Sequence, residues 1–320
     1  EVASTRPTAI SRCMRVFGVD ENGLGPRLGP LIATGVTLEL KSYSDSALRR
    51  RGEALGITDS KASSAFGRMA LAESLTLAVL ERLHGAAPRT ADSLFAELAV
   101  DGMVGLRAPC PSGETARQCW ADSPSLPLFG GDIVDGRKRL KALEGRSVLR
   151  ITRARSVLVC AGVLNHELAL GRTKLAVDLN AFERLMLDAR AASDEPLLAI
   201  CGMVGGIRKY EGYFGRFPAA NVHPMEESKQ RSVYGVDGVG EVRFEVNADA
   251  NHLPVAMASM IGKYVREVSM ERLNRYYVGH DPSLPRVSGY HDPKTRDMVE
   301  RTQALRYKLQ IADACFERRG

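Results

Sequence analysis

The chain has 320 residues, which is enough for one large domain or two ordinary ones. Its 44% hydrophobic and 26% charged residues are typical of a soluble globular protein. The sequence contains no apolar run of about 18 residues, so we expect no membrane span. The net charge of +6 permits a polyanionic partner without requiring one. Because the first residues lack the apolar core of a secretory signal, we expect a cytoplasmic protein, or a nuclear or organellar one in a eukaryote.

The six cysteines do not form a recognisable metal motif. None of them makes a CxxC pair, which excludes a zinc ribbon. Cys110 and Cys119 flank a loop and could bridge, but in a protein of this class we expect reduced thiols.

The first part of the chain predicts two strands and a helix. Apolar runs at 13–20 and 31–41 are typical of strands, and a turn rich in glycine and proline joins them. Residues 49–57 fit a loop or a short helix. Helical spacing of apolar residues then predicts a helix over 62–83, with an N-cap among residues 58–60.

The middle of the chain combines an insertion with elements of a central sheet. Residues 86–146, which include a candidate helix at 93–104, are interpreted as an insertion that packs on the main domain. The β-branched stretch 147–163 predicts a strand, and 175–192 predicts a helix. The short apolar run 196–204 is typical of a strand buried in a central sheet.

The last third predicts one more strand and two helices. Residues 206–240 mix basic, aromatic and turn residues, which suits either a nucleic-acid surface or a solvated amphipathic helix. An alternating pattern predicts a strand at 241–246, and 253–277 predicts a long helix. The charge-dense tail 294–319 predicts an amphipathic helix.

These elements predict an α/β class with a mixed sheet flanked by helices. Strands that alternate with helices indicate a layered α/β or α+β domain, and the first two strands look antiparallel. We expect the main domain to span 13–270, with the insertion around 86–146, and a helical C-terminal region to span 271–320.

Acidic residues follow two of the predicted strands. Asp20 and Glu21 come at the end of the first, and Asp249 follows the later one. Since neighbours on a strand point to opposite faces, Asp20 and Glu21 fit best where the chain turns. Such carboxylates could bind Mg²⁺ or Mn²⁺, and two ions about 3.5–4 Å apart can hydrolyse a phosphodiester. Cations that could then hold the flanking phosphates are Lys61, Lys263 and Arg266.

Four motifs in order resemble the type 2 ribonucleases H (ribonuclease HII), especially the archaeal and eukaryotic branch. They touch most of the chain outside 86–146. The motifs are Asp20-Glu21-x-Gly23-x-Gly25-Pro26-x-x-Gly29-Pro30; Asp59-Ser60-Lys61; Ala248-Asp249-Ala250 with Pro254-Val255, Ala258-Ser259 and Lys263-x-x-Arg266; and Ser288-Gly289-Tyr290 with Asp292-Pro293-Lys294-Thr295-Arg296.

The resemblance implies a ribonuclease H-like fold and a metal-dependent endonuclease. Its substrate would be RNA in RNA–DNA hybrids, or a single ribonucleotide in duplex DNA. The implied roles are metal ligation by Asp20, Glu21 and Asp249; contact with the ribose 2′-OH by the backbone of Gly23, Leu24 and Gly25; phosphate contact by Lys61; and stacking near the junction sugar by Tyr290.

The sequence departs from the family pattern at three places, of which Glu267, the acid after Lys263-x-x-Arg266, is a mild change. Leu24 stands where the family usually has arginine. The family also has an aspartate at the end of a central strand, and Gly202 stands there if Val204-Gly205 is aligned with the family's Val-Gly. An alternative alignment through Val236-Asp237-Gly238 would restore the carboxylate with Asp237.

Three hypotheses therefore stay open. The chain is an active ribonuclease, or a non-catalytic relative that binds the hybrid or serves as a subunit of a complex. In the second case the insertion or the C-terminal helix could contact a protein partner. In the third, a ribonuclease H-like domain acts on another phosphodiester, because a fold does not fix a function.

Overall fold

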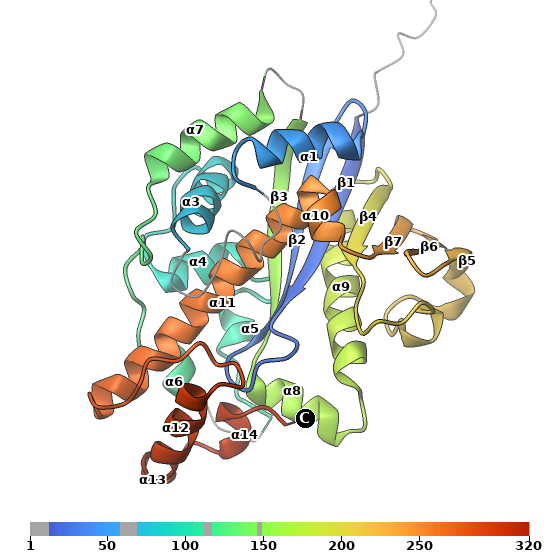
Figure 1. Cartoon of the computed structure of the whole chain (residues 1–320). Helices are drawn as coiled ribbons and strands as arrows, with labels where there is room; N and C mark the ends of the chain where they lie inside the picture. Colours follow the sequence, from blue (N-terminus) through green and yellow to red (C-terminus); the bar gives the residue numbers. More distant parts are fainter. Residues whose placement is uncertain (1–12, 58–68, 112–116, 146–148, 320) are drawn as a thin grey trace, which may run out of the picture.

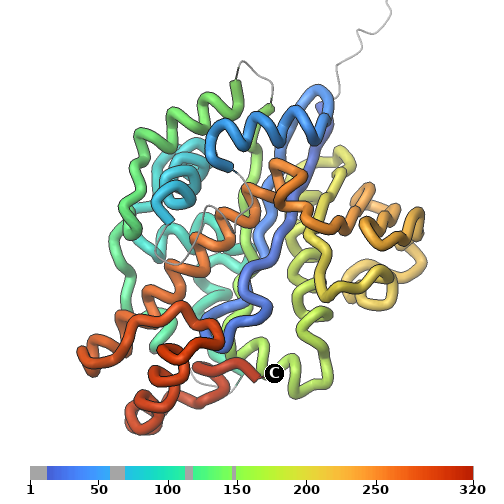
Figure 2. The backbone as a smooth tube through the Cα atoms, viewed as in Figure 1, coloured from blue at the N-terminus to red at the C-terminus, as the bar shows by residue number. Residues whose placement is uncertain are grey.

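The computed structural model describes residues 13–57, 69–111, 117–145 and 149–319 (Figures 1 and 2). Within these residues no helix is both long and apolar enough to cross a membrane. A central sheet carries helices on both of its faces (Figure 1). The expected mixed sheet flanked by helices, with a helical C-terminal region, is confirmed.

The sheet has seven strands in the order β3-β2-β1-β4-β7-β6-β5. β1, β4 and β7 run parallel, whereas β2 and β6 run antiparallel to their neighbours. The carboxyl ends of the three parallel strands therefore meet at one edge. The strands are β1 (Met14–Asn22), β2 (Leu31–Leu40), β3 (Leu149–Val159), β4 (Leu197–Gly202), β5 (Val222–Glu227), β6 (Arg231–Val236) and β7 (Gly240–Glu245).

Two buried clusters separate the faces of the sheet. One lies mainly under α11 and the α3–α4–α7 group, and the other lies under α9. Along β1 the faces alternate, so Val16 belongs to the first cluster and Phe17 to the second. The helices on the first face are α1 (Asp45–Glu53), α3 (Ala70–His84), α4 (Ala91–Leu98), α7 (Ile133–Glu144), α10 (Ala248–Asn251) and α11 (Leu253–His280).

Glycines allow α11 to lie directly on β1. A Cβ on Gly18 would come 2.2 Å from the backbone carbon of Pro254, and one on Gly262 would come 2.4 Å from Nδ2 of Asn22. At Gly18 the backbone of α11 therefore lies directly on β1, and at Gly262 the helix leaves room for the side chains of Asn22 and Thr34. This contact aligns α11 with the last residues of β1.

Glu73 on α3 holds the insertion against the main domain. Its buried carboxylate accepts hydrogen bonds from the backbone N–H groups of Leu128, Phe129 and Gly131. Tyr264 of α11 donates to it as well. These hydrogen bonds hold residues 128–131 on α3, and the interpretation of 86–146 as an insertion stays a prediction. Two further helices of this segment are α5 (Gly102–Leu106) and α6 (Arg117–Trp120).

α9 (Lys174–Ala191) covers the second face and follows α8 (Ala161–Ala169). Thr173 caps α9 by accepting a hydrogen bond from the N–H of Ala176. α9 packs on β1, β2 and β3, and Leu175 in its first turn lies close to Gly205, just beyond the carboxyl end of β4. The prediction of a helix over 175–192 is confirmed to within one residue at each end.

Three sequence-based expectations need correction. α3 begins at Ala70, later than the expected 62, and residues 58–68 lie outside the described residues. Much of 206–240 forms the β5–β6 hairpin, with short 3-10 turns before it. There Tyr210 is buried and stacks on Phe244 with ring centroids 3.9 Å apart, so this ring stabilises the fold.

The C-terminal tail is three short helices in place of one amphipathic helix. These are α12 (Pro293–Arg301), α13 (Gln303–Lys308) and α14 (Asp313–Phe316). The chain reverses after α13 through Gln310, whose φ is 56°, and the buried Arg306 then pairs with Asp313 at 3.0 Å. α11 runs without a break through residue 270, so the C-terminal region separates from the main domain only after that helix.

Candidate metal centre at the carboxyl edge of the sheet

Asp20 lies on the α11 face of β1 at the carboxyl edge. Val19 pairs with Cys201 of β4, and β1 continues past this last pair to Asn22. Beyond Val19 the strand therefore has no partner on its β4 side. The expectation that the chain turns at Asp20 and Glu21 is wrong, because both residues remain in the strand and pair with β2.

The surroundings of Asp20 contain both like and opposite charges. Burial, together with the nearby carboxylates of Glu21 and Asp249, raises the pKa of this carboxyl to about 8. A hydrogen bond with the Ser259 side chain and the charge of Lys263 act in the opposite direction. The structure thus brings Asp20, Asp249 and Lys263 together, as the sequence predicts.

Asp249 reaches the site from the first turn of α10. The turn follows β7 immediately, and Asn247 makes the transition with a left-handed φ of 54°. Asparagine tolerates this backbone conformation better than most residues. Because β7 runs parallel to β1 and β4, the turn brings Asp249 to the edge where Asp20 lies.

Glu21 points toward the opposite face of the sheet, since side chains alternate along β1. Burial raises the pKa of its carboxyl, while a hydrogen bond from the Leu24 N–H and the charge of Arg318 lower it. Arg318 is buried and donates hydrogen bonds to the backbone carbonyls of Gly23 and Pro26. Arg318 therefore both binds the glycine loop and offsets the negative charge of Glu21.

Gly202 takes the position beside Asp20 on β4. A Cβ on Gly202 would lie 2.8 Å from Oδ1 of Asp20, so a carboxylate there would enter the site. Asp237 instead follows β6 at the other end of the sheet. Val236 pairs with Gly240 of β7, which in turn pairs with Leu197 of β4. Leu197 pairs with Arg15 of β1, and Arg15 precedes Asp20 by five residues, or about 16 Å along the strand. The geometry thus favours the alignment through Gly202.

The glycine loop after β1 docks on the C-terminal region. Gly23 and Gly29 have positive φ values of 92° and 86°, which favour glycine. The backbone N–H groups of Arg27 and Leu28 both donate to the carbonyl of Gly289, at 2.8 and 2.9 Å. Within this loop Gly25 is exposed, and apart from its chain neighbours no described residue lies within 4 Å of the place where its Cβ would be.

Arg266 fixes Tyr290 above this loop. Its side chain is 2% exposed, and its guanidinium donates to the carbonyl of Ser288 at 2.9 Å. The same guanidinium stacks on the ring of Tyr290 at 4.8 Å, while Tyr290 itself is 50% exposed. Arg266 is therefore placed to orient Tyr290, and the predicted contact of Arg266 with phosphate stays a prediction. Lys61 lies outside the described residues.

The donor chemistry of this edge fits a hard divalent cation. The convergent side chains offer carboxylate oxygens, the ligands preferred by Mg²⁺ and Mn²⁺. Among the described residues no three His, Cys, Asp or Glu side chains are already gathered as ligands around one point. Carboxylates repel one another at short range, and a cation between them removes that repulsion.

The sequence analysis missed two residues of this site. Arg318 comes from the end of the chain, and nothing in the local pattern links it to Glu21. Asp178 of α9 is the other, and it is fully buried near Glu21 and Asp20. A signal for Asp178 exists, since it lies three residues after Leu175 and four before Phe182, on the apolar stripe of the helix.

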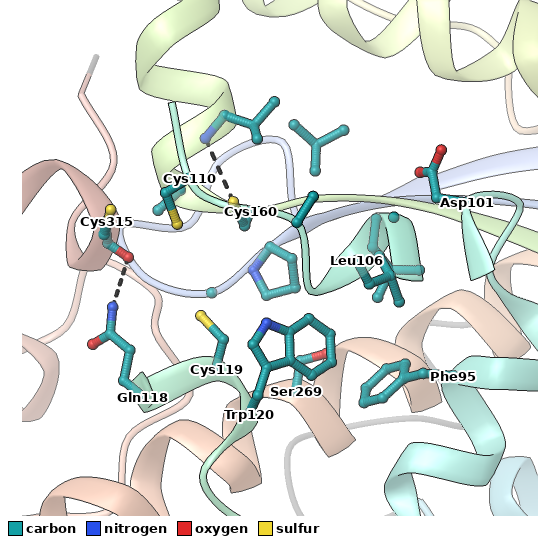
Figure 3. A pocket seen from close by; sticks show the side chains of 18 of the residues that line it. Phe95, Asp101, Leu106, Cys110, Gln118, Cys119, Trp120, Cys160, Ser269 and Cys315 are labelled. Atoms are coloured by element: carbon teal, nitrogen blue, oxygen red, sulfur yellow. Dashed lines mark hydrogen bonds between the residues drawn. The ribbon is translucent and has the colours of Figure 1, made fainter. Parts of the chain in front are cut away.

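A separate cavity of about 420 Å³ lies between the insertion and the C-terminal region (Figure 3). Phe95, Leu106 and Trp120 line it together with the side chains of four cysteines. Gln118 closes one end by donating a hydrogen bond to the carbonyl of Cys315 at 2.8 Å. Asp20, Glu21 and Asp249 do not line this cavity, so it is distinct from the acidic edge.

Sequence comparison finds similarity to curated ribonucleases HII. The ribonuclease HII of Brucella anthropi is 29% identical over 151 residues, which cover 45% of this chain and 63% of that protein. The ribonuclease HII of Brucella suis gives the same identity and coverage. The chain thus matches less than two thirds of the length of these relatives. No protein-family model matches it.

Comparison with solved structures gives matches at low identity. The ribonuclease HII of Archaeoglobus fulgidus, solved in complex with PCNA, is 18% identical with a TM-score of 0.46, over 95% of this chain and 93% of that one. Bst-RNase HIII, solved with Mn²⁺, is 15% identical with a TM-score of 0.47, over 99% of this chain and 71% of that one.

The fold and the acidic edge define a mixed-sheet protein with clustered carboxylates at the ends of its parallel strands. In sequence the chain is similar to the Brucella enzymes, and its four ordered motifs resemble those of the type 2 ribonucleases H. The curated relatives named above are bacterial, and the placement in the archaeal and eukaryotic branch stays a prediction.

Proposed function

We propose that the chain is a metal-dependent endonuclease that cleaves RNA in RNA–DNA hybrids or at ribonucleotides embedded in duplex DNA. The observation that carries this proposal is the convergence at one edge of Asp20, Glu21 and Asp249 beside Lys263. The glycine loop and the exposed Tyr290 flank the same edge. The similarity to ribonucleases HII supports ribonuclease H activity in general.

Asp20, Glu21 and Asp249 would hold Mg²⁺ or Mn²⁺ through their carboxylate oxygens. Such an ion, when bound, supplies activation of a water and stabilisation of the leaving oxygen of a phosphodiester. Ser259 orients the Asp20 carboxylate, because its side chain hydrogen-bonds to it from the buried face of α11. Lys263 is placed to contact a phosphate next to the scissile bond.

The glycine loop would discriminate RNA from DNA. The N–H of Leu24 and the carbonyl of Gly23 are occupied by Glu21 and Arg318, respectively. Gly25 is the open position of the loop, and its backbone can approach a ribose 2′-OH without obstruction. Tyr290 offers an exposed ring nearby that can stack on a sugar or a base.

A second candidate function is non-catalytic binding of the same nucleic acids. Gly202 favours it, because a strand carboxylate beside Asp20 is missing. In that case a protein partner could bind the insertion or the C-terminal region, and the chain would act within a complex. Both candidates use the same surface, so binding alone does not separate them.

The test is cleavage of a labelled DNA duplex that carries one ribonucleotide, in Mg²⁺ or Mn²⁺. The wild-type chain should cut at the ribonucleotide, and Asp20→Asn should abolish cutting, because it removes a central carboxylate. Asp237→Asn serves as a control, since Asp237 lies at the opposite end of the sheet and is exposed. An all-DNA duplex of the same sequence tests the requirement for the 2′-OH.

Each outcome selects one candidate. Cutting that is lost in Asp20→Asn and kept in Asp237→Asn supports the endonuclease. Tight binding without cutting in either metal supports the non-catalytic relative. Equal cutting of the all-DNA duplex would instead indicate another phosphodiester substrate, and cutting that survives Asp20→Asn would contradict the proposed site.

A further inference from the structure

The acidic edge contains a buried carboxylate that the sequence motifs do not include. Asp178 lies in the second turn of α9, and its exposed fraction is 0%. The residues on either side of it, Val177 and Leu179, belong to the same buried cluster as Cys201 at the end of β4. Asp178 therefore lies under the sheet, on the face toward which Glu21 points.

Packing at the start of α9 fixes this position. Leu175 lies one turn before Asp178, and a Cβ on Gly205 would come 3.4 Å from its Cδ1 atom. Gly205 follows Gly202 by three residues, just beyond the end of β4. The first turns of α9 thus lie at the carboxyl end of β4, where the missing strand carboxylate would have been.

Asp178 has no compensating partner among the described residues. Both of its oxygens, Oδ1 and Oδ2, are buried without a hydrogen bond. Burying a carboxylate in this way is unfavourable unless a cation or a set of donors compensates it. The other buried acids behave differently, since Glu73 and Glu183 each accept hydrogen bonds from three backbone N–H groups.

Nearby charges agree with this placement. Burial raises the pKa of the Asp178 carboxyl well above its ordinary value, and the charges of Glu21 and Asp20 raise it further. The charges that act on Asp178 are thus those of the acidic edge.

We propose that Asp178 is a ligand of the divalent cation at this edge and supplies from α9 the carboxylate that Gly202 does not supply from β4. This inference rests on the proposed function only for the metal-binding role of the edge. The cation would lie around the free end of β4, where Glu21 and Asp178 approach from one face and Asp20 from the other. A divalent metal ion with oxygen preference, Mg²⁺ or Mn²⁺, is the ligand class.

Two readouts that do not involve nucleic acid test the proposal on the full chain. The first is Mn²⁺ binding by isothermal titration calorimetry, with no substrate present. The second is the melting temperature in a chelator and in excess Mn²⁺. The variants are Asp178→Asn, the double variant Gly202→Asp/Asp178→Asn, and the control Asp194→Asn, which removes an exposed carboxylate just beyond α9.

Asp178→Asn should weaken Mn²⁺ binding at least about tenfold, which is the lower end of the range of affinity losses seen when a residue around a metal site is removed. In chelator it should melt at a higher temperature than the wild type, because the repulsion of Asp178 by Glu21 and Asp20 is gone. The gain in melting temperature from Mn²⁺ should shrink. Gly202→Asp/Asp178→Asn should recover Mn²⁺ affinity, and Asp194→Asn should match the wild type.

Unchanged Mn²⁺ affinity in Asp178→Asn would overturn the inference, as would a wild-type chain that binds no Mn²⁺. A lower melting temperature of Asp178→Asn in chelator, with unchanged affinity, would make Asp178 a purely structural residue. The metal-binding test and the nuclease test can fail independently of each other. A wild type that binds Mn²⁺ through Asp178 and cuts no ribonucleotide would refute the nuclease and leave the metal ligand in place.

Discussion

The two faces of the acidic edge balance their charges differently. On the α11 face, Asp20 and Asp249 lie beside Lys263 and the side chain of Ser259. On the α9 face, Glu21 accepts a hydrogen bond from the Leu24 N–H and lies near the positive charge of Arg318. The oxygens of Asp178, in contrast, have no hydrogen-bond donor among the described residues. Protein groups offset part of the negative charge on the first face, whereas no described donor contacts the oxygens of Asp178 on the second.

This difference shows where a bound cation would contribute most. Protein donors and a lysine already offset part of the repulsion on the α11 face. The remaining negative charge lies around Glu21 and Asp178, and a divalent ion is the group that would neutralise it. Loss of the strand carboxylate at Gly202 need not leave the site one ligand short, because α9 brings a carboxylate to the same edge.

The largest expected loss of activity comes from a substitution on the α11 face. Asp249→Asn should lower kcat/KM for the ribonucleotide duplex by at least about 100-fold, since it removes one of the carboxylates that would hold the metal ion. Steady-state cleavage assays measure this, with circular dichroism to confirm folding. A folded Asp249→Asn variant with near wild-type activity would exclude Asp249 from the site.

The pH dependence of stability tests the charge balance without substrate. In chelator the pKa of Asp20 is about 8 in the folded chain, against an ordinary value of 3.8. Between these values the folded chain holds a proton that the unfolded chain releases. Asp20 therefore makes the folded chain less stable as pH rises from about 4 to about 8. Asp20→Asn should flatten this fall in melting temperature, and an unchanged slope would contradict the assignment.

A smaller effect is expected on the α9 face from Arg318. Arg318→Gln removes charged hydrogen bonds to the carbonyls of Gly23 and Pro26, which should lower the free energy of unfolding by about 2 kcal/mol. Cleavage should fall about tenfold, because the loop and Glu21 lose a common partner. Urea unfolding and cleavage assays measure both. The exposed Arg319→Gln is the matched control, and a loss of the same size there would refute a specific role.

The smallest effects separate two glycines of one loop. Gly23→Ala should destabilise the chain by about 1–3 kcal/mol, because its φ is 92° and its Cβ would lie 3.0 Å from Arg266. Gly25→Ala should change stability by less than about 0.5 kcal/mol, since none of the residues that the structure describes crowds its Cβ position. It should raise KM for the ribonucleotide substrate by filling the open space, and an unaffected KM would move the 2′-OH contact elsewhere.

Much of the frame was predictable from local pattern. Apolar runs locate β1, β2 and β4, and helical spacing locates α9 and most of α11. The position of Asp20 and Asp249 at strand ends predicts their meeting, because parallel strands end at one edge. The β5–β6 hairpin was not predicted, since β5 is largely exposed and its sequence is polar.

The remaining parts of the site depend on contacts between distant segments. Arg318 lies 295 residues from Gly23 in the chain, so no local pattern connects them. The single predicted tail helix was wrong because Gln310 reverses the chain and Arg306 is buried within the fold of the tail. Asp178 was the one missed residue with a local signal, a charged side chain on an apolar stripe.

Manganese located by anomalous diffraction from crystals soaked in Mn²⁺ tests the central claim most directly. The account predicts an anomalous peak at the carboxyl edge of the sheet, with oxygens of Asp20, Glu21 and Asp178 at about 2.0–2.6 Å. Asp249 should lie at the same ion or at a second one about 3.5–4 Å away. A peak that Asp178 does not contact, or no peak at this edge in saturating Mn²⁺, would contradict it.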